Sequence, residues 1–170
     1  MDKSQKNVKD LDAISVSIGP GSYTGLRIGL AVAKGLSYGL NIPIIPIETL
    51  DSLLEIGKKE YANDALCAVI DARRMEVYSK IRSGQGELLK DTSATIVKDD
   101  TFAFCEPFIC FGDGAEKLSE LWSHRNVVID KDLKLSALGQ VQLAFQKYKY
   151  GEFDVVAYLK PLYLKDFKIG

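Results

Sequence analysis

The hydrophobic pattern of the first fifty residues changes from a period of two to a period near 3.6. Ile14, Val16 and Ile18 alternate with small or polar residues, which is typical of a β-strand. Apolar residues then recur at helical spacing over residues 24–39, and a short apolar run punctuated by prolines follows at 41–47. This order predicts a βαβ unit in which a helix connects two parallel strands.

The rest of the pattern predicts a second helix and then a unit richer in strands. The helix is expected from Thr49 to about Lys59, with Thr49 as its cap and its leucines turned inward. Further strands are expected at 65–70, 75–82, 94–97, 107–111 and 127–130, and further helices at 114–123 and 136–148. Two small α/β units follow from this order: a partial first lobe at 1–61, carrying a helix suited to a partner, and a second lobe at 65–170.

A glycine-rich segment, Gly19-Pro-Gly-Ser-Tyr-Thr-Gly25, connects the first strand to the first helix. Glycine tolerates positive φ and lets other groups approach the backbone, and Ser22 or Thr24 can cap the helix. Two interpretations stay open: a tight strand-to-helix turn, and an anion site at the helix N-terminus. The sequence has neither G-x-G-x-x-G nor a Walker lysine here, which favours the tight turn.

Small residues form a row along the first predicted helix. Gly25, Gly29 and Ala33 recur every four residues, and Gly35 and Gly39 continue the row. A glycine inside a helix costs roughly 1 kcal/mol relative to alanine, so several in one helix indicate an offsetting close contact. Packing against this chain's own sheet and packing against a partner helix are both consistent with the row.

Composition narrows the function classes. The chain has 170 residues, 46% hydrophobic and 26% charged, which is enough for one sizeable core or two small ones. A formal net charge of -1 gives no general attraction to nucleic acid, so a contact with RNA has to be local or shared with a partner. The polar start and the lack of a membrane-length apolar run lead us to expect a cytoplasmic protein with no membrane partner.

The residues that usually carry catalysis or bind metals are sparse. Cys67, Cys105 and Cys110 lack metal-site spacing and are expected to be reduced core residues. His124 is the single histidine, so it is interpreted as a surface residue and no metal site is expected. Gly35-Leu-Ser-Tyr-Gly39 matches the G-x-S-x-G nucleophile elbow, but Ser37 lies inside a continuing helical pattern, which argues against a hydrolase. No catalytic residue is predicted.

Gly112, Asp113 and Gly114 follow a predicted buried strand. One interpretation is a capped turn, with Asp113 as the N-cap of the next helix. The other is a turn that lies near a bound nucleotide, as glycine turns do in actin-like ATPases. The capped turn is favoured.

Two further groups of charged residues have simple electrostatic interpretations. Asp71, Arg73 and Arg74 lie in a predicted hairpin turn, where they are either solvated or make a local contact with RNA or a protein. Arg27 and Lys34 lie seven residues apart on one edge of the first helix and are suited to pair with carboxylates of a partner.

The segment Ile18-Gly-Pro-Gly-Ser-Tyr-Thr-Gly-Leu-Arg-Ile-Gly29, with Ala33-Lys-Gly-Leu36 and Ile42-Pro43 after it, resembles the bacterial TsaB family, also called YeaZ. Further matches are Ile70-Asp-Ala-Arg-Arg74, Glu76-Val-Tyr78, Gly112-Asp-Gly-Ala115 and Pro161-Leu-Tyr163. The resemblance covers nearly the whole chain and implies the actin-like ATPase fold of sugar kinases, Hsp70 and actin, an α/β fold with two related lobes. The family pattern also has an N-terminal stretch, with an Asp-Thr-Ser hairpin and a first helix, that this sequence lacks, so an incomplete first lobe is expected.

The resemblance implies a noncatalytic dimerisation scaffold. TsaB-like proteins hold a TsaD-like catalytic subunit, which transfers a threonylcarbamoyl group to the adenosine next to the anticodon of tRNA, and a TsaE-like ATPase joins the complex. No cofactor is expected, nor a tRNA contact outside the complex, and the chain alone is expected to form a homodimer. The implied partner interface is Tyr23, Leu26, Arg27, Gly29, Leu30, Ala33 and Leu36. The alternative is a nucleotide-binding or glycoprotease-type, peptidase-like enzyme of the same fold.

Overall fold

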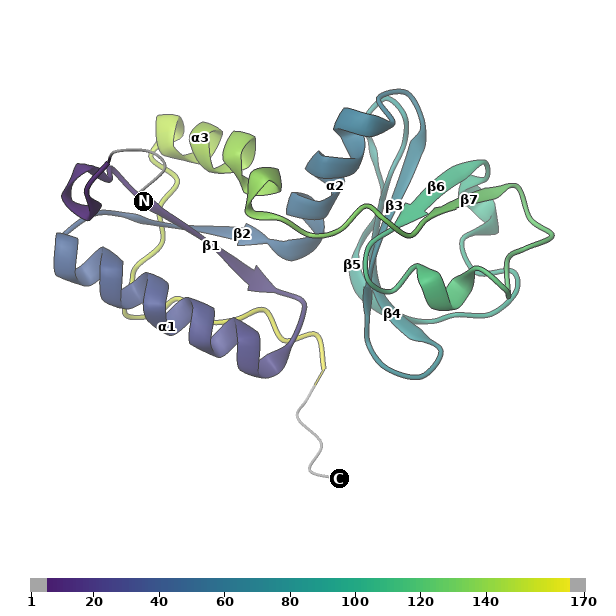
Figure 1. The fold of residues 1–170 in the computed structure, drawn as a ribbon, viewed down its shortest axis with the longest axis horizontal. Helices are drawn as coiled ribbons and strands as arrows, with labels where there is room; N and C mark the ends of the chain where they lie inside the picture. The colour runs from purple at the N-terminus through teal and green to yellow at the C-terminus, as the bar shows by residue number, and fades with distance from the viewer. Residues whose placement is uncertain (1–5, 166–170) are drawn as a thin grey trace.

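The computed structural model describes residues 6–165 and contains two β-sheets that lie next to each other along the molecule (Figure 1). In the first sheet β1 (Ile14–Gly19) pairs in parallel with β2 (Ile44–Glu48), and α1 (Tyr23–Leu40) connects them. The predicted βαβ unit is therefore confirmed. Residues 1–5 and 166–170, which the two predicted lobes include, lie outside the described residues.

The second sheet has the strand order β5-β4-β3-β6-β7. Its strands are β3 (Ala65–Asp71), β4 (Glu76–Arg82), β5 (Leu88–Ile96), β6 (Phe108–Phe111) and β7 (Val127–Asp130). β3, β4 and β5 form an antiparallel meander, whereas β6 and β7 run parallel to β3, so the fold is mixed α/β. All five predicted strands are present, and β5 is longer than expected because its N-terminal half pairs with β4 across a bulge.

α2 (Thr49–Glu60) covers one face of the second sheet. Leu50 and Leu53 are fully buried, as predicted. A Cβ atom at Gly57 would lie 2.3 Å from Cζ of Phe111, so only glycine lets the helix approach the sheet this closely. The prediction of Thr49 as the cap is wrong: Glu48 is the N-cap residue, and Oγ1 of Thr49 instead lies 2.8 Å from Oγ of Ser17.

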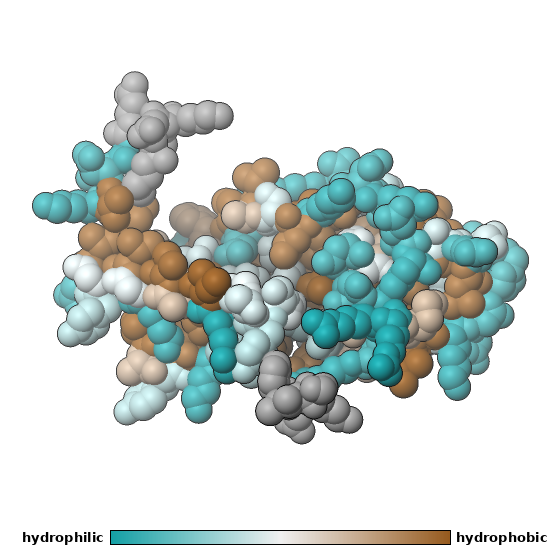
Figure 2. All heavy atoms as spheres, turned by 60° about the horizontal axis from the view of Figure 1, so that its bottom comes forward, coloured by the Kyte–Doolittle hydropathy of each residue, from teal (hydrophilic) through white to brown (hydrophobic). Residues whose placement is uncertain are grey.

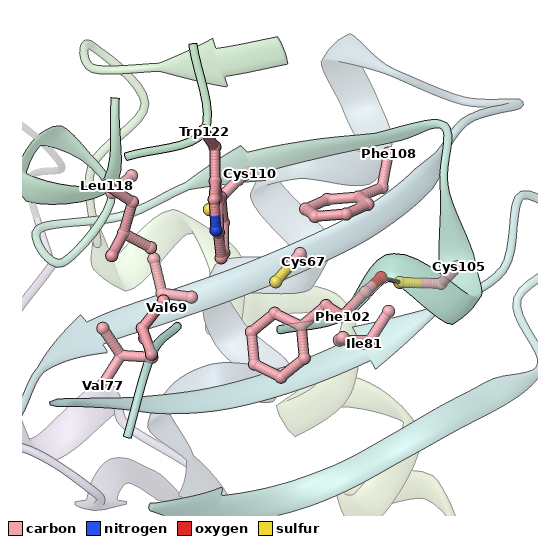
Figure 3. Packing of buried hydrophobic residues seen from close by; sticks show 12 residues of the cluster. Cys67, Val69, Val77, Ile81, Phe102, Cys105, Phe108, Cys110, Leu118 and Trp122 are labelled. Atoms are coloured by element: carbon pink, nitrogen blue, oxygen red, sulfur yellow. Dashed lines mark hydrogen bonds between the residues drawn. The ribbon is translucent and has the colours of Figure 1, made fainter. Parts of the chain in front are cut away.

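The opposite face of the second sheet carries an aromatic and sulfur-rich core. Figure 3 shows Trp122, Phe102 and Phe108 surrounding Cys67, which is opposite Cys110 in the β3–β6 register. The three cysteines are free and buried, which confirms the prediction of core residues. Burial raises the pKa of the Cys105 thiol to about 12, so this thiol stays protonated at neutral pH.

The prediction of a helix over 114–123 is wrong. The structure has only a 3-10 turn, η3 (Glu116–Leu118), and further turns before β7. Gly112 has a φ of +107°, and a Cβ at Gly112 would lie 2.2 Å from the carbonyl oxygen of Val69. The loop is thus held by close packing on β3, and not by a continuous helical hydrogen-bond ladder. The other short 3-10 turns are η1 (Val8–Asp10) and η2 (Ala103–Cys105).

The last part of the chain returns to the first sheet. After η4 (Ala137–Gln140), α3 (Val141–Tyr150) lies alongside β2, and the extended segment that follows α3 in the chain runs along α1 (Figure 1). Leu162 N–H donates to the carbonyl oxygen of Ile18 at 2.7 Å. Leu159 is buried with Val16 and Leu30. The division into 1–61 and 65–170 stays a prediction, but these contacts connect the C-terminal segment to the first unit.

A buried ion-pair cluster joins the two units. The side chain of Lys80 on β4 is only 7% exposed, and its Nζ lies 2.9 Å from Asp51 and 3.3 Å from Glu48. Burial alone would lower the pKa of Lys80, but the hydrogen bonds and charges of Asp51 and Glu48 outweigh burial and raise it. The ammonium therefore stays charged throughout the neutral range.

No helix within residues 6–165 has both the length and the apolar character needed to cross a membrane.

The glycines of the two long helices predict opposite responses to alanine. Gly57→Ala should destabilise the chain by about 1–3 kcal/mol, because its methyl group meets the Phe111 ring. Gly35→Ala should stabilise it by up to about 1 kcal/mol, because a Cβ there meets nothing within 4 Å and alanine favours the helix. Urea unfolding of both variants tests this, and stabilisation by Gly57→Ala would contradict the close packing of α2.

Candidate functional site

The inner face of α1 packs on the first sheet. Ser22 caps the helix, since its Oγ accepts the N–H of Gly25 at 3.2 Å. Leu30 and Ala33 are each 5% exposed and pack against Val16 and Ile44. The side chains of Leu30 and Ala33 therefore contact this chain's own sheet, which corrects their expected place on a surface open to a partner.

The opposite side of α1 is apolar and open. Ile28 and Val32 are 60% and 58% exposed, and Leu36 is also exposed. We call this surface the α1 outer face, and it consists of Gly25, Ile28, Gly29, Val32, Gly35, Leu36 and Gly39. Figure 2 shows a row of hydrophobic residues along this helix.

Three of the four glycines of the α1 outer face have no close neighbour among the described residues, whereas a Cβ at Gly25 would meet the capping side chain of Ser22 at 3.3 Å. A Cβ at Gly29, Gly35 or Gly39 would meet nothing within 4 Å. The described part of the chain therefore gives no packing reason for these three glycines. The sequence-based interface missed Ile28 and Val32, although their helical spacing with Gly25 and Leu36 is a signal that could have identified them.

The N-terminal part of the predicted interface contacts the C-terminal segment. Nε of Arg27 donates to the hydroxyl of Tyr163 at 3.0 Å, and the guanidinium lies 4.0 Å from the ring centroid of Tyr23. The rings of Tyr23 and Tyr163 are 5.1 Å apart. Lys34 donates to the carbonyl oxygen of Ala157 at 3.3 Å. Arg27 and Lys34 thus hold the extended C-terminal segment against α1.

The same segment explains the glycine turn before α1. Gly19 has a φ of +122°, and a Cβ there would lie 2.7 Å from the carbonyl oxygen of Leu162 and 3.1 Å from Leu26. The group that approaches this turn is therefore the chain's own backbone. This contact supports the tight-turn interpretation of the motif.

A second group of predicted residues meets at the carboxyl ends of β3 and β6. The backbone N–H of Asp71 donates to Oδ1 of Asp113 at 3.0 Å. Asp113 is therefore turned toward β3 and is not a helix cap, which corrects that expectation. A Cβ at Gly114 would lie 3.0 Å from the backbone nitrogen of Asp71, so the loop of Gly112 to Gly114 fits closely on β3. Its proximity to a nucleotide stays a prediction.

Asp71 also anchors the hairpin between β3 and β4. Its carboxylate accepts the N–H of Arg73 at 2.9 Å and forms an ion pair with Lys117. The hydrogen bond from Lys117 is the main reason that the pKa of Asp71 lies below its usual value. The sequence placed Asp71 and Asp113 in separate turns, and Lys117 was missed because only the fold brings it to the hairpin.

The residues considered for enzyme chemistry occupy structural positions. Ser37 is 1% exposed inside α1, and its Oγ donates to the carbonyl oxygen of Ile42 at 2.5 Å. His124 is at the surface, 3.4 Å from Asp99. Within residues 6–165 no three His, Cys, Asp or Glu side chains come together as metal ligands would. A cavity lined by Ile18, Glu48 and Lys147 has about 180 Å³.

Comparisons with known proteins agree on one group. The family model "TsaD: tRNA N6-adenosine threonylcarbamoyltransferase" matches residues 1–153. The tRNA threonylcarbamoyladenosine biosynthesis protein TsaB of Haemophilus influenzae is 28% identical over 94% of this chain and 72% of its own length. The Escherichia coli protein of that name is 26% identical over 96% of this chain and 74% of its own length. YeaZ from Pseudomonas aeruginosa has a TM-score of 0.79 at 27% identity, covering 96% of this chain and 79% of that protein.

The Asp71 cluster predicts a pH-dependent contribution to stability. A carboxyl whose pKa is lowered by folding stabilises the protein above its unfolded pKa of about 3.9, and this contribution is lost as the pH falls through the folded pKa. Asp71→Asn should therefore cost about 1 kcal/mol at pH 7, a small value because the side chain is 48% exposed. The difference from the unsubstituted chain should shrink as the pH falls below the unfolded pKa of about 3.9.

Urea unfolding at pH 7 and at low pH measures this effect. Asp12→Asn is the control, because Asp12 is exposed. An equal effect of Asp71→Asn at both pH values would contradict an electrostatic role for Asp71.

Proposed function

Because the chain belongs to the family of the tRNA N6-adenosine threonylcarbamoyltransferase TsaD, we propose that it takes part in threonylcarbamoylation of the adenosine next to the tRNA anticodon. Its part is that of a noncatalytic scaffold, which binds a TsaD-like catalytic subunit through the α1 outer face. The TsaB relatives are named for biosynthesis of the same modified nucleoside. The α1 outer face is the observation that carries the proposal.

The energetics of the α1 outer face favour a helix as its partner. Burial of the exposed parts of Ile28, Val32 and Leu36 would contribute roughly 1 kcal/mol each. Gly29 and Gly35 lower the intrinsic stability of α1 by roughly 1 kcal/mol each relative to alanine. A second helix whose backbone approaches at these glycines gains close packing that offsets this loss.

The positions of the candidate catalytic side chains support a noncatalytic role. The buried hydroxyl of Ser37 donates a hydrogen bond to the carbonyl oxygen of Ile42, and His124 lies at the surface. The cavity of about 180 Å³ between the first sheet, the start of α2 and α3 is smaller than the roughly 300–1,000 Å³ of typical small-molecule sites. The alternative role as a nucleotide-dependent or peptidase-like enzyme therefore has less support.

The proposal includes the finer architecture and the wider assembly. Two α/β units, each with helices on its sheet, fit the actin-like ATPase fold with two lobes. The first lobe takes residues 1–61 together with the C-terminal segment that returns to it, and the second begins at 65. In the cytoplasm a TsaE-like ATPase joins the complex, tRNA reaches this chain through the complex, and the chain alone pairs with a second copy.

A charge on the α1 outer face should abolish partner binding without unfolding the chain. Val32→Glu should weaken binding of the TsaD-like subunit at least tenfold, because the carboxylate would be buried without a partner. Tm measured by circular dichroism should stay within a few degrees, since Val32 is 58% exposed. Calorimetric titration with the TsaD-like subunit of the same organism measures the affinity, and tRNA modification by the mixture should fall in parallel.

Val128→Glu is the matched control, because Val128 is 54% exposed on β7. Its affinity for the catalytic subunit should equal that of the unsubstituted chain. Unchanged binding by Val32→Glu would exclude the α1 outer face as the interface. Turnover of ATP or peptide by the isolated chain, lost on Asp113→Ala or Ser37→Ala respectively, would contradict the noncatalytic role.

A further inference from the structure

Arg73 and Arg74 form the tip of the β3–β4 hairpin in an unfavourable backbone conformation. Their φ values are +69° and +51°, which lie in the left-handed region that residues other than Gly, Asn and Asp rarely adopt. Each such residue costs about 1 kcal/mol or more. We call the loop of Arg73, Arg74 and Met75 the hairpin tip. In Figure 1 it lies at the lower end of β3 and β4.

Three surrounding groups hold the hairpin tip in this conformation. Nζ of Lys117 donates to the carbonyl oxygens of Arg74 and Glu76 at 2.8 and 2.6 Å. The carboxylate of Asp71 accepts the N–H of Arg73 and the ammonium of Lys117. Asp113 in turn accepts the N–H of Asp71. The tip is therefore preorganised before any ligand arrives, which lowers the entropic cost of binding.

The two guanidinium groups form no ion pair with a nearby acid, although the charge of Arg73 also acts on Asp71 and helps to lower the pKa of that carboxyl. Asp71 is paired with Lys117, and Glu76 is paired with Lys165. Glu116 lies 3.9 Å from Lys131. Within residues 6–165 no ion pair or side-chain hydrogen bond involves the guanidinium of Arg73 or Arg74, and both residues are exposed. Two adjacent arginines are therefore free to bind an anion.

We propose that the hairpin tip is a direct contact for tRNA, in which Arg73 and Arg74 bind backbone phosphates. The inference rests on the proposed function, which brings tRNA to the complex. A guanidinium donates two parallel hydrogen bonds to a phosphate, and adjacent arginines can bind neighbouring phosphates of one strand. With a formal net charge of -1, the chain has no general attraction to RNA, so such a contact has to be local.

The surroundings of the hairpin tip favour RNA over a protein partner. Protein interfaces have an apolar, water-excluded centre, and the α1 outer face offers one. The exposed neighbours Asp71, Asp113 and Glu116 are acidic, but Lys117 pairs with Asp71 and Lys131 lies 3.9 Å from Glu116, which offsets their repulsion of phosphate. Met75, 41% exposed, is the apolar exception. In Figure 2 hydrophilic residues predominate over the part of the molecule away from α1. A polar surface with unpaired arginines suits the phosphate backbone.

The test compares charge removal at the hairpin tip with equal charge removal elsewhere. In the first variant, Arg73→Asn with Arg74→Gly, both replacements favour positive φ, so the hairpin should be retained or stabilised. The control is Lys58→Ala with Lys59→Ala, two adjacent exposed lysines at the end of α2. Affinity for an unmodified tRNA transcript is measured by filter binding from 50 to 300 mM KCl, with the complex of this chain and its catalytic subunit.

We expect the tip variant to bind tRNA severalfold more weakly at low salt, with the slope of log K against log [KCl] reduced in magnitude by about 1 to 2. The control should match the unsubstituted complex, and calorimetry should show unchanged assembly with the catalytic subunit. An affinity and slope equal to those of the control would overturn the proposal. A loss of assembly in the tip variant would also overturn it, because it would assign the arginines to a protein contact.

The same titration with the isolated chain at 50 mM KCl separates this proposal from the scaffold role. At this low salt a direct phosphate contact gives the isolated chain a weak affinity for tRNA, even though tRNA reaches it through the complex at physiological salt. If the catalytic subunit does not bind the unsubstituted chain, the proposed function fails, and the isolated-chain titration still decides the RNA contact. Weaker tRNA binding by the tip variant than by the lysine control would then support the contact, and equal binding would refute it.

Discussion

The ion pairs of the buried Lys80 ammonium with Glu48 and Asp51 fix the two halves of this protein to each other. A charge removed from water needs charged partners, and here they are Glu48, where β2 ends, and Asp51, in the first turn of α2. Removal of one member of a buried ion pair typically costs about 3–5 kcal/mol. Lys80 lies on β4 and also pairs with Asp91 on β5 at 3.5 Å, within the second sheet. Because Glu48 and Asp51 belong to the other unit, their pairs with Lys80 set how α2 and the first sheet meet the second sheet.

The space around each glycine distinguishes positions packed inside the chain from positions on an open surface. At Gly19, Gly57 and Gly112 a Cβ would collide with the chain itself, so the fold explains these glycines. At Gly29 and Gly35 a Cβ would meet nothing described, although both lie in the middle of a helix where glycine is unfavourable. The described residues therefore give no packing reason for glycine at these two positions of the α1 outer face.

The two surfaces proposed for binding differ in chemistry and lie on different units. The α1 outer face is apolar and rich in glycine, which suits close packing with another helix. The hairpin tip is polar and carries unpaired arginines, which suits phosphates. The Lys80 cluster holds both in one body, so a catalytic subunit on one surface and an RNA on the other would keep a fixed relative position.

Local patterns predicted the strands and long helices, because the alternation of Ile14, Val16 and Ile18 and the inward leucines of α2 report burial directly. They failed where distant contacts decide the local structure. The helix expected after Asp113 does not form, because that carboxylate bonds to β3. Leu30 and Ala33 were expected at the partner interface because the small-residue spacing did not show which face of α1 meets the sheet. The approach of Leu162 to the glycine turn also depends on a segment far away in the sequence.

The central claim is that the α1 outer face binds the catalytic subunit, and site-specific photo-crosslinking tests it most directly. A photoreactive amino acid is placed at Leu36 in one sample and at Ile96, on the outer edge strand β5, in another; both side chains are exposed. After mixing with the TsaD-like subunit and irradiation, the account predicts a heterodimeric crosslink from position 36 and none from position 96. Crosslinking from position 96 alone would contradict it.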